Sequence, residues 1–168
     1  MTLSLVLVRH AKSDWADPSL DDHDRPLNAR GLRDAPTMAQ RLVETGLRPD
    51  TIIASTALRA ATTAEFFGAA FGLPVERQER LYGAPAALLL GAAAETGARS
   101  VVVVAHDPGM TVLAGRLSGD AIAHMPTCAV ATFTWDEDSW DVATAVDPDD
   151  WTLETPRCTS PRASGCRI

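Results

Sequence analysis

The stretch SLVLVRHAKS, residues 4–13, decides the fold that this sequence predicts. Its first half is an uninterrupted apolar run, and a short strand that is apolar on both faces is typical of the interior of a parallel sheet. The run ends directly at Arg9 and His10. Because ligands bind beyond the carboxyl ends of the strands in open α/β sheets, we expect both side chains to lie at the edge of a binding crevice.

Two further apolar segments are also followed directly by polar or basic residues. Thr51–Ala54 is followed by Ser55 and then by Arg59 in the first turn of a predicted helix. Ser100–Ala105 is the strongest strand signal, because its four consecutive valines are β-branched, and it ends at His106. Parallel strands share one carboxyl edge, so we expect two arginines and two histidines to converge on one pocket.

The remaining pattern predicts an α/β fold in a single domain of three layers, α/β/α, with a mostly parallel sheet. Helices are expected at residues 29–45, 56–71, 85–95 and 108–117, and an edge strand at residues 74–77. Residues 130–135 and 140–146 predict an antiparallel hairpin at one edge of the sheet. We therefore expect a catalytic domain over residues 1–146 and a poorly ordered C-terminal tail over residues 147–168, which lack periodicity.

Composition excludes several classes of function. The net charge of −7 argues against nucleic acid as a partner, because a phosphate backbone requires a basic face. Apolar runs are too short to predict a membrane span, and the N-terminus lacks the pattern of a signal peptide. Three cysteines, Cys128, Cys158 and Cys166, favour a reduced, cytoplasmic protein. The sequence leaves the oligomeric state open.

The expected cluster suits a phosphoryl group. Guanidinium forks match phosphate oxygens, one histidine can attack phosphorus, and the other can donate a hydrogen bond to a phosphoryl oxygen. The sequence contains no phosphate-binding glycine motif of the G-x-x-x-x-G-K-[ST] or G-x-G-x-x-G type, and no H-E-x-x-H or C-x-x-C metal motif. Arginines beside the histidines would repel a cation, so we expect no metal and no cofactor.

Three motifs of the chain resemble a known family. The segment at residues 7–13 resembles the Arg-His signature of the histidine phosphatase superfamily, which includes the phosphoglycerate mutases. The segments at residues 55–62 and 104–109 are similar to its second and third motifs. The resemblance covers residues 3–135, and it implies a phosphatase that carries the phosphoryl group on a histidine.

The small phosphohistidine phosphatases are the branch that the chain resembles most. They share an alanine and a Lys-Ser pair after the histidine, as in residues 11–13, and a pattern like that of residues 24–28. This resemblance implies a hydrolase that needs no metal and acts on phosphohistidine in a protein. It also implies a role for each of six residues: a nucleophile, His10; a clamp for the phosphoryl oxygens, Arg9, Arg59 and His106; and substrate-binding groups, Arg25 and Ser13.

The sequence does not decide which residue, if any, acts as the general acid that protonates the leaving group. Glu79 matches the register of the acid in the mutases, and Asp14 and Asp24 are rivals. A phosphate ester needs a proton delivered to its leaving alkoxide. The imidazole of phosphohistidine can leave already protonated, so an enzyme for N–P bonds can work with a weak acid or with none.

Two rival functions stay open from the sequence. Within the same class, the partner would be a small phosphorylated molecule and the protein a phosphomonoesterase. In a different class, the pocket would bind a phosphorylated protein without hydrolysing it.

Overall fold

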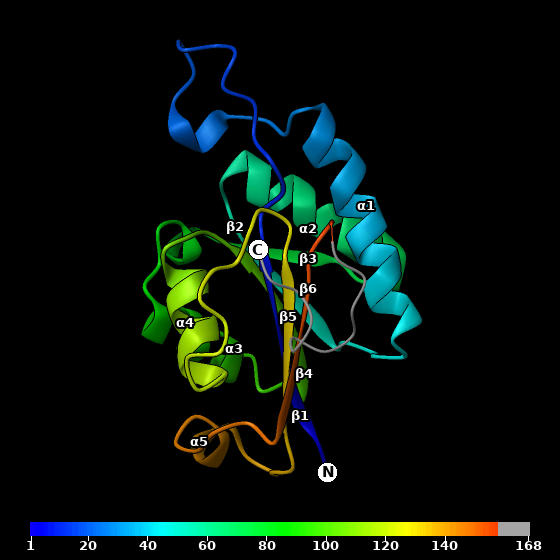
Figure 1. The fold of residues 1–168 in the computed structure, drawn as a ribbon, viewed down its shortest axis with the longest axis vertical. Coiled ribbons are helices and arrows are strands. Elements are labelled where there is room, and N and C mark those ends of the chain that lie inside the picture. Colours follow the sequence, from blue (N-terminus) through cyan, green and yellow to red (C-terminus); the bar gives the residue numbers. More distant parts are fainter. Residues whose placement is uncertain (158–168) are drawn as a thin grey trace.

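Strand β1, Leu3–Arg9, lies in the interior of a six-stranded sheet of order β3-β2-β4-β1-β5-β6 (Figure 1). In this computed structural model, which describes residues 1–157, β1 pairs in parallel with β4, Ser100–Ala105. Arg9 lies opposite Ala105 in this register, so the residues that follow the two strands leave the sheet at the same edge. The predicted convergence of two strand ends is therefore confirmed.

Four strands run in parallel, as the sequence predicts. Strand β2, Thr51–Ser55, pairs with β4 on one side and with the edge strand β3, Val75–Gln78, on the other. On the opposite side of β1 lies β5, Val130–Trp135, which is antiparallel to it. The sheet is thus mostly parallel with an antiparallel edge, in agreement with the predicted fold class.

Helices cover both faces of the sheet and give the predicted three layers (Figure 1). One face packs against α1, Ala29–Glu44, and α2, Leu58–Phe71. The other face packs against α3, Ala86–Glu95, α4, Gly109–Leu117, and the short helix α5, Trp140–Ala143.

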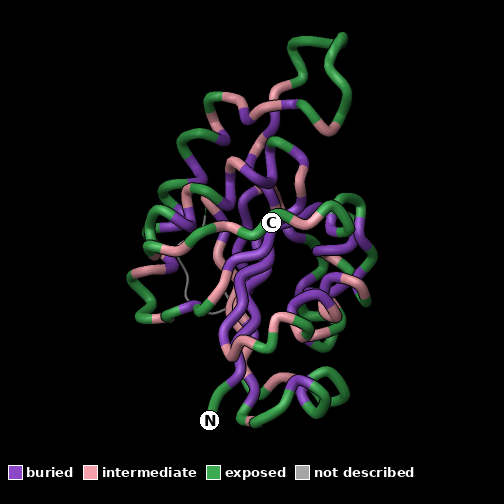
Figure 2. Tube along the Cα trace, turned by 180° about the vertical axis from the view of Figure 1, so that it is seen from behind, coloured by how far each residue is buried: buried purple, intermediate pink, exposed green. Residues whose placement is uncertain are grey.

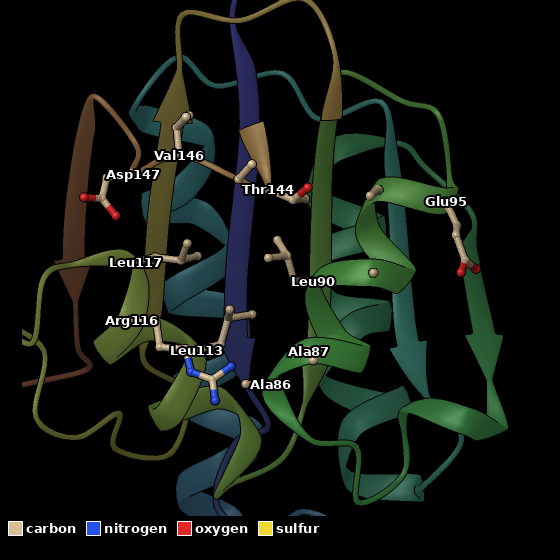
Figure 3. A pocket seen from close by; sticks show the side chains of 13 residues that line it. Ala86, Ala87, Leu90, Glu95, Leu113, Arg116, Leu117, Thr144, Val146 and Asp147 are labelled. Carbon is tan, nitrogen blue, oxygen red and sulfur yellow. The ribbon is translucent and has the colours of Figure 1, made fainter. Parts of the chain in front are cut away.

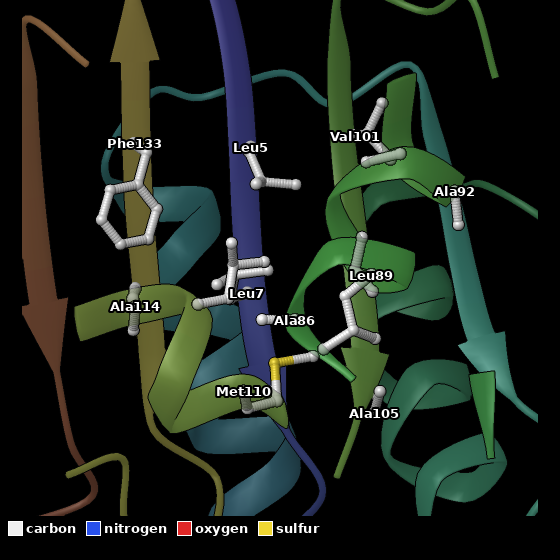
Figure 4. Packing of buried hydrophobic residues seen from close by; sticks show 14 of the residues in the cluster. Leu5, Leu7, Ala86, Leu89, Ala92, Val101, Ala105, Met110, Ala114 and Phe133 are labelled. Carbon is white, nitrogen blue, oxygen red and sulfur yellow. The ribbon is translucent and has the colours of Figure 1, made fainter. Parts of the chain in front are cut away.

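Alternation along β1 explains this arrangement. Side chains of a strand point to opposite faces in turn, and here both faces are apolar. Leu5 and Leu7 pack toward α3 and α4, where Leu89 and Met110 meet them (Figure 4). The intervening valines pack toward α1 and α2. The strands accordingly form the buried centre of the molecule in Figure 2.

The end of the chain differs from the predicted hairpin. Residues 140–146 do not form a strand: Ser139 Oγ accepts a hydrogen bond from the backbone N–H of Asp141 and caps the helix α5. The strand beside β5 is instead β6, Asp150–Glu154, which lies in the stretch expected to be a poorly ordered tail. Cys158 and Cys166 fall outside the described residues.

Two short 3₁₀ helices lie in loops that follow strands of the sheet. They are η1, Asp22–Asp24, after β1, and η2, Glu79–Leu81, after β3. Asn28 caps α1 as predicted, because its Oδ1 accepts a hydrogen bond from the N–H of Gly31. Within residues 1–157, no helix is both long and apolar enough to cross a membrane.

Candidate active site

The two histidines meet at the carboxyl edge of the sheet. The ring centroids of His10 and His106 are 5.1 Å apart, and the backbone N–H of His10 donates a hydrogen bond to the oxygen of Ala105. Both residues are buried, with 8% and 5% of their surface exposed. Neighbouring parallel strands therefore hold both imidazoles in one place.

His10 has the protonation state of a nucleophile. Its Nδ1 lies 2.8 Å from the backbone oxygen of Ala11, and a carbonyl can only accept, so Nδ1 carries the proton and Nε2 keeps its lone pair. Burial, helped by the nearby charges of Arg59 and Arg9, lowers the pKa of His10 to about 4 against the opposing effect of the Ala11 hydrogen bond. The ring is therefore neutral at physiological pH.

His106 is held by the end of the neighbouring strand. Its Nε2 lies 2.7 Å from Oγ of Ser55, the last residue of β2. Burial lowers the pKa of His106 to about 3, and the adjacent His10 and Arg59 act in the same direction. An oxyanion bound at this place would reverse that effect, because a negative charge favours the imidazolium.

Arg9 is anchored on the side of the site opposite β2. Its Nη1 donates a hydrogen bond to the oxygen of Met125 at 2.9 Å and lies 3.4 Å from Oδ2 of Asp107. Asp107 also accepts hydrogen bonds from the backbone and hydroxyl of Thr111 in α4. The guanidinium of Arg9 is thus fixed in direction before any ligand binds.

Asp22 links the other two arginines. Its Oδ1 accepts a hydrogen bond from Arg25 Nη2 at 2.6 Å, and its Oδ2 accepts one from Arg59 Nη2 at 2.9 Å. The hydroxyl of Tyr82 donates to the same Oδ2. The Tyr82 hydrogen bond, followed by Arg59, lowers the pKa of Asp22 to about 2, so this carboxylate is ionised at neutral pH.

Several buried donors around this cluster have no hydrogen-bond partner within residues 1–157. In the site they are Arg9 Nε, Arg25 Nε and Nη1, Arg59 Nε, and His106 Nδ1. Buried polar groups in proteins are normally hydrogen-bonded, so a group of unpaired donors in one place needs an explanation. A tetrahedral oxyanion, which only accepts hydrogen bonds, fits this set of donors.

A side chain of helix α2 connects the backbone beside His10 to that of Arg59. The hydroxyl of Thr63, fully buried, accepts a hydrogen bond from the N–H of Ala11 at 3.0 Å. The same hydroxyl donates to the backbone oxygen of Arg59 at 2.7 Å. One side chain therefore fixes the position of the His10 backbone relative to the first turn of α2.

The segment after β1 leaves the body of the protein through a narrow neck. Ser13 and Leu27 form an isolated antiparallel bridge, and the N–H of Asp14 donates to the oxygen of Pro26 at 2.7 Å. Between these points the loop projects beyond the carboxyl edge of the sheet (Figure 1). Ser13 is buried at the neck, and its role in substrate binding stays a prediction.

None of the three predicted acids contacts a site histidine. The Glu79 carboxylate is exposed and makes no hydrogen bond or ion pair within the described part of the chain. Asp14 Oδ1 accepts from the N–H of Ala16 in its own loop, and Asp24 Oδ1 lies 3.6 Å from His23. The assignment of a general acid therefore stays a prediction.

Sequence reasoning missed Asp22 and Tyr82. Asp22 is one of five aspartates in the loop of residues 14–24, and nothing in the sequence distinguishes it from the others. Tyr82 ends η2, far along the chain, yet its ring lies edge-on 5.5 Å from that of His106. Both residues contact the cluster only because the fold brings two loops together.

Within the described residues, this cluster contains no metal site and lies apart from a large cavity on one face of the sheet. In the described residues 1–157, no three His, Cys, Asp or Glu side chains are placed to hold a metal ion together. A cavity of about 570 Å³ lies between α3, α4 and residues 144–147, with Leu90, Leu113 and Leu117 in its wall (Figure 3). None of the predicted site residues lines that cavity.

Comparison with known proteins supports the same chemistry. Residues 5–83 match the model of the histidine phosphatase superfamily, branch 1. A structure from Agrobacterium tumefaciens, assigned as the phosphohistidine phosphatase SixA, is 31% identical with a TM-score of 0.74, over 79% of this chain and 92% of that chain.

Two further structures are similar over most of their length. One, assigned as SixA from Nakamurella multipartitia, is 25% identical with a TM-score of 0.83 and covers 94% of this chain and 98% of its own. The other, the protein histidine phosphatase SixA in complex with tungstate, is 27% identical with a TM-score of 0.70, over 80% and 90% of the two chains.

Proposed function

The chain belongs to the histidine phosphatase superfamily, and we propose that it hydrolyses phosphohistidine on a protein through a phosphoryl group carried by His10. The proposal is supported by similarity to structures assigned as phosphohistidine phosphatases. One of them is a complex with tungstate, a tetrahedral oxyanion like phosphate.

The observation that carries this proposal is the lone pair on His10 Nε2 inside a group of buried cationic donors. Burial keeps the ring neutral, and the Nδ1 contact with Ala11 fixes the tautomer that leaves the lone pair on Nε2. The unpaired donors of Arg59 and His106 could then hold the oxygens of a phosphoryl group during its transfer. An attacking imidazole and an oxyanion clamp in one place are what phosphoryl transfer requires.

In the first step, His10 Nε2 attacks phosphorus and a new N–P bond forms. The substrate ring already carries a proton from solvent on its other nitrogen. The N–P bond to that ring breaks, the electron pair returns to the ring, and neutral imidazole leaves. The guanidinium groups of Arg9 and Arg59 stabilise the charge spread over the phosphoryl oxygens.

In the second step, water attacks the phosphoryl group on His10. The N–P bond to Nε2 breaks, inorganic phosphate leaves, and His10 regains its lone pair. The hydrogen bond from Nδ1 to Ala11 keeps the ring in the tautomer that attacks, so each cycle starts from the same state.

The absence of an acid in contact with either site histidine, within the described residues, favours an N–P substrate. An ester would leave as an alkoxide and would need a proton from a positioned donor. The Asp22 carboxylate, which lies nearest the clamp, is ionised because the pKa of its carboxyl group is about 2. Imidazole, with an ordinary pKa near 6.5, is the better leaving group at such a site.

The experiment measures phosphate release from a phosphohistidine protein by the wild type and by His10→Ala, in the presence of EDTA. We expect release by the wild type and a loss of at least about a thousandfold in His10→Ala. Acid-labile, alkali-stable phosphate should be trapped on the wild type and not on His10→Ala.

The matched control is His124→Ala, which removes an exposed imidazole and should still trap phosphate. Equal release by the wild type and His10→Ala would contradict the assignment of the nucleophile. Binding without release would favour a recognition module, faster turnover of p-nitrophenyl phosphate or sugar phosphates would favour a phosphomonoesterase, and loss of activity in EDTA would indicate a metal.

A further inference from the structure

Two aromatic side chains of the described chain are more than a third exposed, and both lie against the site. Trp15 is 69% exposed and Tyr82 is 39% exposed. The guanidinium carbon of Arg25 lies 3.3 Å from the ring centroid of Trp15, and Tyr82 contacts both Asp22 and His106. Exposed aromatic groups that lie together at one place on a surface are typical of a binding region.

Trp15 belongs to a small apolar surface on the projecting loop. Trp15, Pro18 and Leu20 line a hollow of about 330 Å³, and Asp17, Asp22 and Arg25 complete its wall. We call the three apolar residues the Trp15 shelf. Because Asp22 and Arg25 also belong to the phosphoryl cluster, a group on the shelf would be continuous with the phosphorylated residue.

The shelf belongs to a segment that stands away from the body of the protein. The loop after β1 projects beyond the sheet in Figure 1, and its outer part is exposed in Figure 2. Leu20, at 38% exposed, has no place in either hydrophobic core. An apolar side chain kept in this position is accessible to a large partner and not only to a small molecule.

The charge around the shelf selects the kind of partner. Residues 14–24 contain five aspartates and no lysine or arginine. Asp22 forms ion pairs with Arg25 and Arg59, whereas Asp21 makes no side-chain hydrogen bond or ion pair within the described residues. The rim is therefore acidic, while the floor of the site is cationic. A small polyanionic metabolite would be repelled by that rim, and a basic segment would be attracted.

We infer that the Trp15 shelf docks the polypeptide next to the phosphohistidine, taking an apolar side chain that has a lysine or arginine beside it. This inference rests on the proposed function and names the substrate class of that same site. The cationic cluster holds the phosphoryl group, the shelf holds the apolar neighbour, and Asp17 and Asp21 face the basic one.

The test compares two short peptides that carry phosphohistidine, one flanked by leucine and lysine and the other by serine and glutamate. Their binding to the His10→Ala protein is measured by fluorescence anisotropy, so docking is measured without turnover. We expect the leucine–lysine peptide to bind about tenfold more tightly. The ratio of the two dissociation constants should fall to about threefold or less when Leu20→Ala or Asp21→Asn is added to the His10→Ala protein.

The control is Val142→Ala, which truncates a side chain of similar exposure on α5, at the opposite end of the sheet (Figure 1). It should leave the ratio unchanged. Equal binding of the two peptides, or an unchanged ratio in Leu20→Ala and Asp21→Asn, would overturn the inference.

The proposed function fails in a distinguishable way. If the wild type releases no phosphate from either peptide or from free phosphohistidine, hydrolysis is contradicted, whatever the His10→Ala protein binds. In the wild type, Leu20→Ala should raise KM for the leucine–lysine peptide and leave kcat/KM for free phosphohistidine within about twofold, because that small substrate does not reach the shelf.

Discussion

Arg59 donates two hydrogen bonds to Asp22, from Nη1 to the backbone oxygen at 2.6 Å and from Nη2 to Oδ2 at 2.9 Å. These two hydrogen bonds fix the guanidinium of Arg59 before a ligand binds. They also place a carboxylate beside the donors that would hold a phosphoryl group. In the proposed reaction Asp22 would therefore have two opposing effects, because it orients the Arg59 guanidinium and would repel an anion bound there.

The first prediction separates these effects. Asp22→Asn keeps an acceptor for Arg59 and Tyr82 but removes the negative charge, so inhibition by tungstate should become about threefold to tenfold stronger. The inhibition constant is measured with free phosphohistidine as substrate. Asp21→Asn, which removes a charge from the adjacent exposed residue, should change the constant by less than about twofold. Weaker inhibition in Asp22→Asn would mean that orientation outweighs repulsion.

The second prediction concerns acid stability. The pKa of His10 is about 4 and that of His106 about 3 in the folded protein, both below the ordinary 6.5. Between pH 6.5 and the folded values, the unfolded chain binds protons that the folded protein does not. The contribution of the two neutral histidines to the free energy of unfolding is therefore fully present above pH 6.5. It is lost as the pH drops, by roughly 3 kcal/mol at most for His10.

Urea denaturation at about pH 7 and about pH 4.5 measures this loss. His10→Asn should lose less stability than the wild type over the same interval, because it has one titrating group fewer. Saturating tungstate should also reduce the loss, since the bound anion raises the pKa of His106. The same loss in the wild type and in His10→Asn would show that His10 is not held neutral by burial.

The third prediction concerns the hydroxyl between the nucleophile and α2. Thr63→Val conserves volume but leaves the buried N–H of Ala11 without its acceptor, so it should lower the free energy of unfolding by about 1–3 kcal/mol. Activity should also fall, because the backbone of His10 is released from the first turn of α2. Thr63→Ser keeps the hydroxyl and should therefore retain most of the stability and most of the activity of the wild type. A fully active and stable Thr63→Val would contradict this role.

The fourth prediction compares two helical glycines. A Cβ at Gly31 would clash with the backbone oxygen of Lys12, in the signature segment, whereas a Cβ at Gly91 meets nothing within 4 Å. Gly31→Ala should destabilise the protein by about 2 kcal/mol or more, because backbone has to move. Gly91→Ala should stabilise it by about 0.5–1 kcal/mol through helix propensity. Thermal denaturation measures both, and the opposite order would contradict the packing of α1 on residue 12.

The core of the site could be predicted from the sequence because its residues follow buried strands directly. Arg9, His10 and His106 each come at the end of an uninterrupted apolar run, and parallel pairing brings those ends together. No long-range information is needed beyond the rule that parallel strands share an edge. The fold class followed from the same runs.

The loop residues of the site could not be predicted in this way. Asp22 and Tyr82 acquire their roles through contacts between two loops, and loop positions follow from tertiary packing and not from periodicity. Trp15 gave no signal either, because a single aromatic residue in a polar loop has no pattern around it.

The C-terminal edge was predicted wrongly for a physical reason. The residues from Trp140 to Val146 alternate in a manner that suits a strand, but the cap at Ser139 and a hydrogen bond from Trp140 Nε1 to the oxygen of Ala98 fix a helical turn. Strand β6 was missed because its alternation is only five residues long and lies among aspartates and a proline.

The neck at Ser13 and Leu27 has a consequence for how this protein could change over evolutionary time. The two ends of the loop are joined by the bridge and by the hydrogen bond from Asp14 to Pro26, so its length is uncoupled from the spacing of β1 and α1. Insertions, deletions or exchange within residues 15–21 would leave the His10 backbone where it is and would spare Asp22 and Arg25, which belong to the cluster. With the docking role inferred for the Trp15 shelf, partner choice could diverge among relatives while the reaction at His10 is inherited unchanged.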